Sequence, residues 1–177
     1  GFGGHRIEGI GDKHIPWVHN VRNTDAVAAI RDADCLRLFR LFNEPSGQEF
    51  LIKEGIAEDI VQKLPLLGIS SIANLLASIK LCKYFELGKD DIIFTVFTDS
   101  AELYQSRLIE QRNLKGEYSE RQAALDWEGT IMSQQIDYFL ELRYWDKKRI
   151  HNLKYYTWIE QQGKTYQEIL QQWDPAY

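Results

Sequence analysis

The sequence contains few sulfur-bearing residues and no long apolar stretch. It has two cysteines and one methionine among 177 residues. Cys35 and Cys82 each fall on the apolar side of a predicted helix, so we expect reduced core thiols and a cytoplasmic location. No apolar run approaches the roughly 18 residues that a membrane-spanning helix needs. The Gly-rich start also lacks the apolar core of a signal peptide, so no membrane association is expected.

The sequence also lacks a basic surplus and a cluster of metal ligands. Its 21 Lys and Arg residues against 26 Asp and Glu residues give a net charge of −5, which argues against a nucleic-acid partner. The four histidines show no i, i+4 pairing and no neighbouring cysteine, so a zinc site is not expected. An apolar content of 44% and a charged content of 27% are typical of a soluble globular protein.

The clearest element is a helix between residues 72 and 82. Apolar side chains recur there at helical spacing, at Ile72, Leu75, Leu76, Ile79 and Cys82. Short apolar runs lie on either side, at 66–69 and 92–97, and we predict both as strands of a parallel sheet. The pattern therefore predicts a strand–helix–strand unit, a type of unit that binds its ligands outside the carboxyl ends of the strands.

Capping and stop signals predict further helices. These are a helix from Asp25, one around 36–42 closed by Asn43-Glu44-Pro45, one within 46–55 and one near 57–64. Ser119 has capping-box spacing with Gln122, and the chain beyond it is expected to be helical. Aromatic residues crowd this last part, and we expect another domain or subunit to bury them.

Three short motifs stand out, two of them directly after the predicted strands and one upstream in a glycine-rich loop. They are Gly9-Ile10-Gly11 within residues 5–11, Gly68-Ile69-Ser70-Ser71, and Thr98-Asp99-Ser100-Ala101-Glu102-Leu103-Tyr104. Together they resemble the C-terminal part of the cysteine synthase family. This family consists of pyridoxal 5'-phosphate (PLP) enzymes of the tryptophan-synthase-β-like fold, also called fold type II. The resemblance extends over residues 5–112.

The resemblance gives Ser100 the most specific role. The family motif is Pro-Asp-Ser-Gly-Glu-Arg-Tyr, and its serine hydroxyl binds the pyridine nitrogen of PLP. Four positions match, at Asp99, Ser100, Glu102 and Tyr104, and three differ, at Thr98, Ala101 and Leu103. A hydroxyl partner leaves the ring nitrogen largely unprotonated, which suits β-elimination and β-replacement. The alternative is that Ser100 only caps the helix that follows it.

The two other motifs resemble family loops around the cofactor. Gly9, Ile10 and Gly11 match His-x-Ile-x-Gly-Ile-Gly, a loop that approaches the cofactor so closely that a Cβ would block it. The resemblance therefore assigns these three residues to cofactor binding, with an ordinary glycine turn as the alternative. Ser70 and Ser71 match Gly-Ile-Ser-Ser-Gly, and we expect them to cap the helix that begins at Ile72 rather than to bind the cofactor.

Several motifs of the family are missing from the 177 residues. The Schiff-base lysine motif, the Ser/Thr-Gly-Asn substrate loop and the Gly-Thr-Gly-Gly-Thr phosphate loop cannot be found, and Lys80 and Lys83 lie in no such context. No catalytic residue is therefore assigned to this chain. Because the only methionine is Met132, Gly1 is not expected to be a translational start. The resemblance implies that this chain is a fragment of a homodimeric enzyme. The partner of the fragment would be the missing N-terminal part of the same enzyme.

We therefore expect an α/β fold in two parts. Residues 1–112 would form part of a PLP-binding α/β domain with parallel strands, and residues 113–177 an all-helical C-terminal extension. The parent enzyme would catalyse β-replacement or β-elimination on a serine-, O-acetylserine- or cysteine-like amino acid, with this chain alone inactive. The alternative is a non-catalytic, truncated or degenerate paralogue that serves as a binding module.

Overall fold

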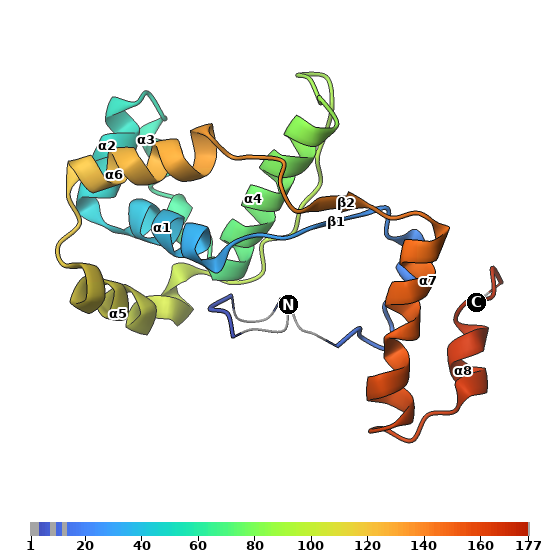
Figure 1. Ribbon diagram of the computed structural model, residues 1–177. Helices are drawn as coiled ribbons and strands as arrows, with labels where there is room; N and C mark the ends of the chain where they lie inside the picture. Colours follow the sequence, from blue (N-terminus) through green and yellow to red (C-terminus); the bar gives the residue numbers. More distant parts are fainter. Residues whose placement is uncertain (1–3, 8–9, 12–13, 177) are drawn as a thin grey trace. The chain divides into compact units, whose positions relative to one another are not determined.

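The computed structural model describes residues 4–7, 10–11 and 14–176. The chain divides into two compact units. Unit 1 contains residues 11–27 and 139–177 with the first four residues, and unit 2 contains residues 5–10 and 28–138. The fold is mostly helical (Figure 1).

Unit 2 is built around the helix α1, Asp32–Asn43. Its other helical elements are α2 (Pro45–Lys53), α3 (Glu58–Val61), η2 (Leu64–Leu66), α4 (Ile69–Tyr84), η3 (Ala101–Tyr104), α5 (Gln105–Lys115), α6 (Glu120–Trp127) and the π-helical turn η4 (Glu128–Met132). Helix α1 packs against α4, α2 and α6 (Figure 1). Leu38, Phe39 and Leu41 of α1 are completely buried, and burial of each contributes about 1.5–3 kcal/mol. The core of unit 2 therefore lies between α1 and α4.

Unit 1 has a smaller core that includes a buried lysine. Its helical elements are η1 (Val21–Asn23), α7 (Tyr144–Asn152), the π-helical turn η5 (Tyr155–Ile159) and α8 (Tyr166–Gln171). The Lys154 ammonium donates to the carbonyl oxygens of Trp17 at 2.8 Å and His19 at 2.9 Å, and to Oε1 of Gln172 at 2.7 Å. These three acceptors compensate for the removal of the charge from water. Lys154 thereby ties the segment before η1 to the end of α8.

The sheet in the described part of the chain has two strands. β1 (Ala26–Ala28) pairs with β2 (Phe139–Glu141). The amide of Ala29 donates to the Tyr138 carbonyl and the amide of Leu142 donates to the Asp25 carbonyl, which is an antiparallel register. A helix from Asp25 was expected, and the structure places β1 there instead, with the helix starting at Asp32. The part after residue 112 is accordingly not all-helical, because it contains β2.

The predicted parallel sheet is wrong for the described residues. Residues 66–69 end a 3-10 turn and begin α4, and residues 92–97 form neither helix nor strand. Pro65 in the turn cannot donate to a strand ladder. The segment 92–97 instead runs back beside α4, where Asn74 Nδ2 donates to the Val96 carbonyl at 2.8 Å (Figure 1). A strand needs a neighbour for its backbone groups, and the described residues supply none here.

Candidate functional site

Two of the sequence motifs meet in unit 2, at the start of α4. The amide of Gly68 donates to the carbonyl oxygen of Asp99 at 2.8 Å. The Ser71 hydroxyl donates to the same carbonyl at 3.3 Å and accepts from the amide of Thr98 at 3.2 Å. The junction of Gly68–Ser71 with Thr98–Ser100 is the candidate site. It brings together residues about thirty positions apart in the sequence.

Close backbone approach at this junction explains the glycine at position 68. A Cβ there would lie 2.2 Å from Asp99 Oδ1 and 2.9 Å from Cε2 of Tyr104. The other carboxylate oxygen, Oδ2, accepts a hydrogen bond from the Tyr104 hydroxyl. Oδ1 itself is buried and has no hydrogen-bond partner in the described part of the chain. The Asp99 carboxylate thus lies against Gly68 with one oxygen unused.

The structure places Ser100 at the N-cap position of η3, where it is half-buried. Its side chain makes no capping hydrogen bond, so the hydroxyl is not used in the way that the simple capping alternative requires. The expectation that Ser70 and Ser71 cap a helix at Ile72 is wrong. Helix α4 begins at Ile69 with Gly68 as its N-cap, so both serines lie within its first turn.

The glycine motif is described only in part. Gly9 lies outside the described residues. Ile10 is exposed and belongs to unit 2, and no hydrogen bond in the described part links it to Ser100. Gly11 belongs to unit 1 and has φ of 79°, a left-handed conformation that glycine adopts without strain. The structure therefore joins Gly68–Ser71 to Asp99 and Ser100, and it does not bring Ile10 into that junction.

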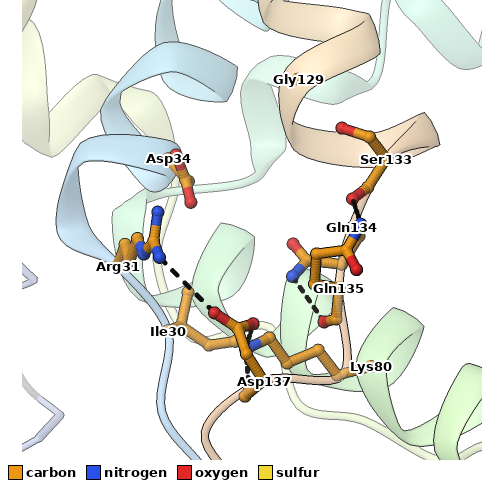
Figure 2. Close-up of a pocket in the computed structure, with 9 residues that line it drawn as sticks. All are labelled: Ile30, Arg31, Asp34, Lys80, Gly129, Ser133, Gln134, Gln135 and Asp137. Atoms are coloured by element: carbon orange, nitrogen blue, oxygen red, sulfur yellow. Dashed lines mark hydrogen bonds and ion pairs between the residues drawn. The ribbon is translucent and has the colours of Figure 1, made fainter.

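A second cluster in unit 2 surrounds a buried lysine on α4 (Figure 2). The Lys80 side chain is 4% exposed. Its ammonium donates to the carbonyl oxygens of Ala29 at 3.1 Å and Asp137 at 2.5 Å, and to Oδ1 of Asp137 at 3.0 Å. The hydrogen bond from Lys80 to the Asp137 carboxylate holds the pKa of that carboxyl below its usual value. Arg31 pairs with the other carboxylate oxygen at 3.5 Å.

The space beside Lys80 is small and polar. It has a volume of about 80 Å³, and its lining includes Ser133, Gln134 and Gln135 from the segment that follows η4 (Figure 2). All three hydrogen-bonding directions of the ammonium are occupied by protein oxygens, so Lys80 holds the segment around Asp137 against α4. Sequence reasoning missed this role. The signal was present, because Lys80 follows Ile72 and Leu76 at intervals of four on the buried face of the helix.

The described residues contain no group of three or more His, Cys, Asp or Glu side chains that could hold a metal ion. None of the described helices combines the length and apolar character that crossing a membrane requires. Cys35 is buried in the core and Cys82 is half-buried, and both are free thiols.

Comparison with family models, with curated proteins and with solved structures finds no match for this chain. Its functional interpretation therefore rests on the motifs and on the geometry that they adopt.

Proposed function

We propose that this chain forms one wall of a PLP site, as the C-terminal part of an enzyme that acts on amino acids. The reaction would be β-replacement or β-elimination on a serine-, O-acetylserine- or cysteine-like substrate. The observation that carries the proposal is the hydrogen bond from the Gly68 amide to the Asp99 carbonyl. This hydrogen bond joins the segment Gly68–Ser71 to Asp99, the residue before Ser100, and so supports a shared site for two of the motifs.

The residues present fit a PLP ring on one side. Ser100 would hold the pyridine nitrogen, because the residue is half-buried and its side chain makes no capping bond. Asp99 would orient the loop that carries Ser100, through its bonds to Gly68 and Tyr104. Bound PLP would supply the electron sink for an amino-acid substrate. A neutral hydroxyl beside the ring nitrogen would leave that nitrogen unprotonated and so moderate the sink.

The remainder of the site would come from outside these residues. The Schiff-base lysine and the phosphate loop are expected in an N-terminal part of the same enzyme, which is proposed to be a cytoplasmic homodimer. Lys80 cannot replace that lysine as the structure stands, because its three hydrogen bonds hold it against Ala29 and Asp137. The chain alone is therefore proposed to be inactive.

The test compares two substitutions at Ser100 in the protein extended through its upstream reading frame. Ser100→Asp should protonate the ring nitrogen, slow β-elimination by orders of magnitude and leave PLP bound. Ser100→Ala should weaken PLP binding by about 1 kcal/mol, for one lost hydrogen bond. Ser106→Asp on the exposed face of α5 is the matched control. The readouts are the visible absorbance of PLP and turnover of serine and O-acetylserine.

If both Ser100 variants keep the parent's spectrum and rate, Ser100 does not contact the cofactor and the proposal fails.

A non-catalytic binding module is the second candidate. The observation that favours it is the departure from the family motif at Thr98, Ala101 and Leu103, of which Leu103 is exposed in this structure. The upstream reading frame separates the two functions. A Schiff-base lysine motif followed by a phosphate loop supports the enzyme, whereas a start codon directly before Gly1 supports the module.

A further inference from the structure

A larger pocket lies wholly within unit 1, and neither the motifs nor the proposed function uses it. Its volume is about 590 Å³, within the range of about 300–1,000 Å³ of small-molecule sites. Four aromatic side chains and two cations contribute to its lining, namely Trp145, Tyr155, Tyr156, Tyr166, Lys148 and Arg149. The residues come from α7, η5 and the start of α8.

Local backbone geometry places the tyrosines around the pocket. Helix α7 ends at Asn152, and the π-helical turn η5 follows at Tyr155. Such π-helical turns are rare in proteins, and those that occur are often found at functional sites. The rings of Tyr155 and Tyr156 lie edge to face, with centroids 5.6 Å apart. Both rings are exposed, as are Trp145 and Tyr166, so the pocket offers several aromatic surfaces on which a planar ring can stack.

The charge at the pocket is positive. Residues 143–154 contain five Lys or Arg residues and a single carboxylate, Asp146. Asp146 pairs with Arg149 at 3.5 Å. The Lys148 ammonium lies 4.4 Å from the centre of the Trp173 ring, and within the described residues it pairs with no carboxylate. No acidic side chain lines the pocket. An anion would therefore meet one unpaired cation and one partly paired cation.

A buried histidine lies beside the pocket. His151 of α7 is buried, and its Nε2 lies 3.0 Å from the carbonyl of Ile169 in α8, a residue that lines the pocket. Burial lowers the pKa of His151, and the nearby charges of Lys154, Lys148 and Arg22 lower it further. The larger part of this lowering comes from burial, and the smaller part reflects the positive charges around His151.

We propose that this pocket binds a planar aromatic ligand that carries an anionic group. The ring stacks on Tyr155, Tyr156 and Tyr166, and the phosphate or carboxylate pairs with Lys148 and Arg149. Two sources share this chemistry, a mononucleotide and an aromatic carboxylic acid. The inference is independent of Ser100, because the pocket residues all belong to unit 1 and Ser100 belongs to unit 2.

The experiment is an NMR titration of the whole ¹⁵N-labelled chain with AMP, adenosine, inorganic phosphate and indole-3-acetate. We expect saturable shifts at residues 145–156 and 166–169 with AMP or with indole-3-acetate, and whichever binds identifies the source. Because the proposed site contacts both the ring and the anionic group, adenosine and phosphate should each bind at least about tenfold more weakly than AMP.

Matched substitutions make the result specific. Lys148→Gln and Tyr156→Ala should each weaken binding by about tenfold. Lys89→Gln and Phe94→Ala change the same kinds of side chain at exposed positions in unit 2 and should leave it unchanged. Unshifted amide signals of the buried His151 and Ile169 in the free variants show that unit 1 is still folded.

Three outcomes would overturn the proposal. The first is no saturable shift with any probe, and the second is binding that both pocket variants leave intact. The third is a change of oligomeric state in Tyr156→Ala, seen by sedimentation, because a second copy of the chain would then cover the pocket.

Discussion

The backbone of Gly68 approaches the backbone of Asp99 closely enough for a 2.8 Å hydrogen bond between amide and carbonyl. A Cβ at position 68 would lie 2.2 Å from the Asp99 carboxylate, so any other residue there would force that side chain to shift. The helix start and the returning segment are held in a fixed relation by the hydrogen bond. Asp99 directly precedes Ser100 in the chain, so changes at Gly68 should affect the candidate site.

We expect Gly68→Ala to destabilise unit 2 by about 1–3 kcal/mol, as a methyl group does in a packed region. The new Cβ would push the Asp99 carboxylate away from the Tyr104 hydroxyl. Urea unfolding followed by circular dichroism measures the change. The control is Gly129→Ala in η4, where a Cβ meets nothing within 4 Å. Equal stabilities of the two variants would show that the junction tolerates a side chain.

The segment 92–97 should cause the chain to associate. Phe94 is 97% exposed and Ile92 is 89% exposed, and exposed apolar side chains on an unpaired segment favour contact with another chain. Phe94→Lys should reduce association, measured by sedimentation velocity over a range of concentrations. Val18→Lys, at a 90% exposed position in unit 1, should change it much less. A monomeric parent chain at high concentration would contradict this prediction.

Lys80 should contribute to stability and should not react with PLP. Lys80→Met leaves the Ala29 carbonyl and the Asp137 oxygens without their donor, which we expect to cost about 2 kcal/mol. Lys83→Met, three residues along the same helix, should lower the free energy of unfolding by less. The hydrogen bonds of Lys83 to the carbonyls of Met132 and Gln134 are exposed to solvent. Urea unfolding of the two variants tests the difference.

Reaction with PLP is checked by borohydride trapping and peptide mapping of the chain. The expected result is no stoichiometric label on Lys80, because its ammonium is buried and fully bonded. PLP has a planar ring and a phosphate, so it belongs to the ligand class proposed for the unit 1 pocket. Labelling at Lys148 would therefore report that pocket, whereas a unique label at Lys80 would contradict the role described for it.

Local sequence signals were sufficient for several helices. Apolar spacing predicted a helix at 72–82, and α4 spans Ile69–Tyr84. The helix predicted around 36–42 lies within α1, which ends at Asn43 as expected. Ser119 caps α6 by accepting from the Gln122 amide at 3.2 Å. These features depend on contacts three or four residues apart, so the sequence nearby contains the information that sets them.

Non-local pairing could not be predicted in the same way. The run 92–97 has the composition of a buried strand, but strand formation depends on a partner that local sequence does not specify. The start of α4 shows the same dependence. The helix begins at Ile69, three residues before the predicted start at Ile72, and its N-cap residue Gly68 bonds to the distant Asp99. The unit 1 pocket was also missed. Its aromatic residues were visible in the sequence, but only the turn at η5 and the packing of α8 bring them around one space.

Glu168 should make the stability of α8 depend on acid pH. Its carboxylate accepts from the Thr165 amide at 2.8 Å, from Lys164 at 3.0 Å and from the Thr165 hydroxyl at 3.0 Å. These bonds, that of the backbone amide first, lower the pKa of Glu168 to about 2 from an ordinary 4.5. The carboxylate therefore stabilises the folded state fully above pH 4.5, and this contribution is lost as the pH falls towards 2.

Glu168→Gln keeps the shape of the side chain and removes its charge, so it should destabilise α8 at neutral pH. The difference in stability between the variant and the parent should disappear near pH 2. Hydrogen exchange of the Ile169 and Gln172 amides, which bond within this helix, measures the effect at each pH. Glu160→Gln is the matched control, because the Glu160 carboxylate is exposed and makes no bond in the described residues. A destabilisation by Glu168→Gln that persists unchanged at pH 2 would show that the charge is not what stabilises the cap.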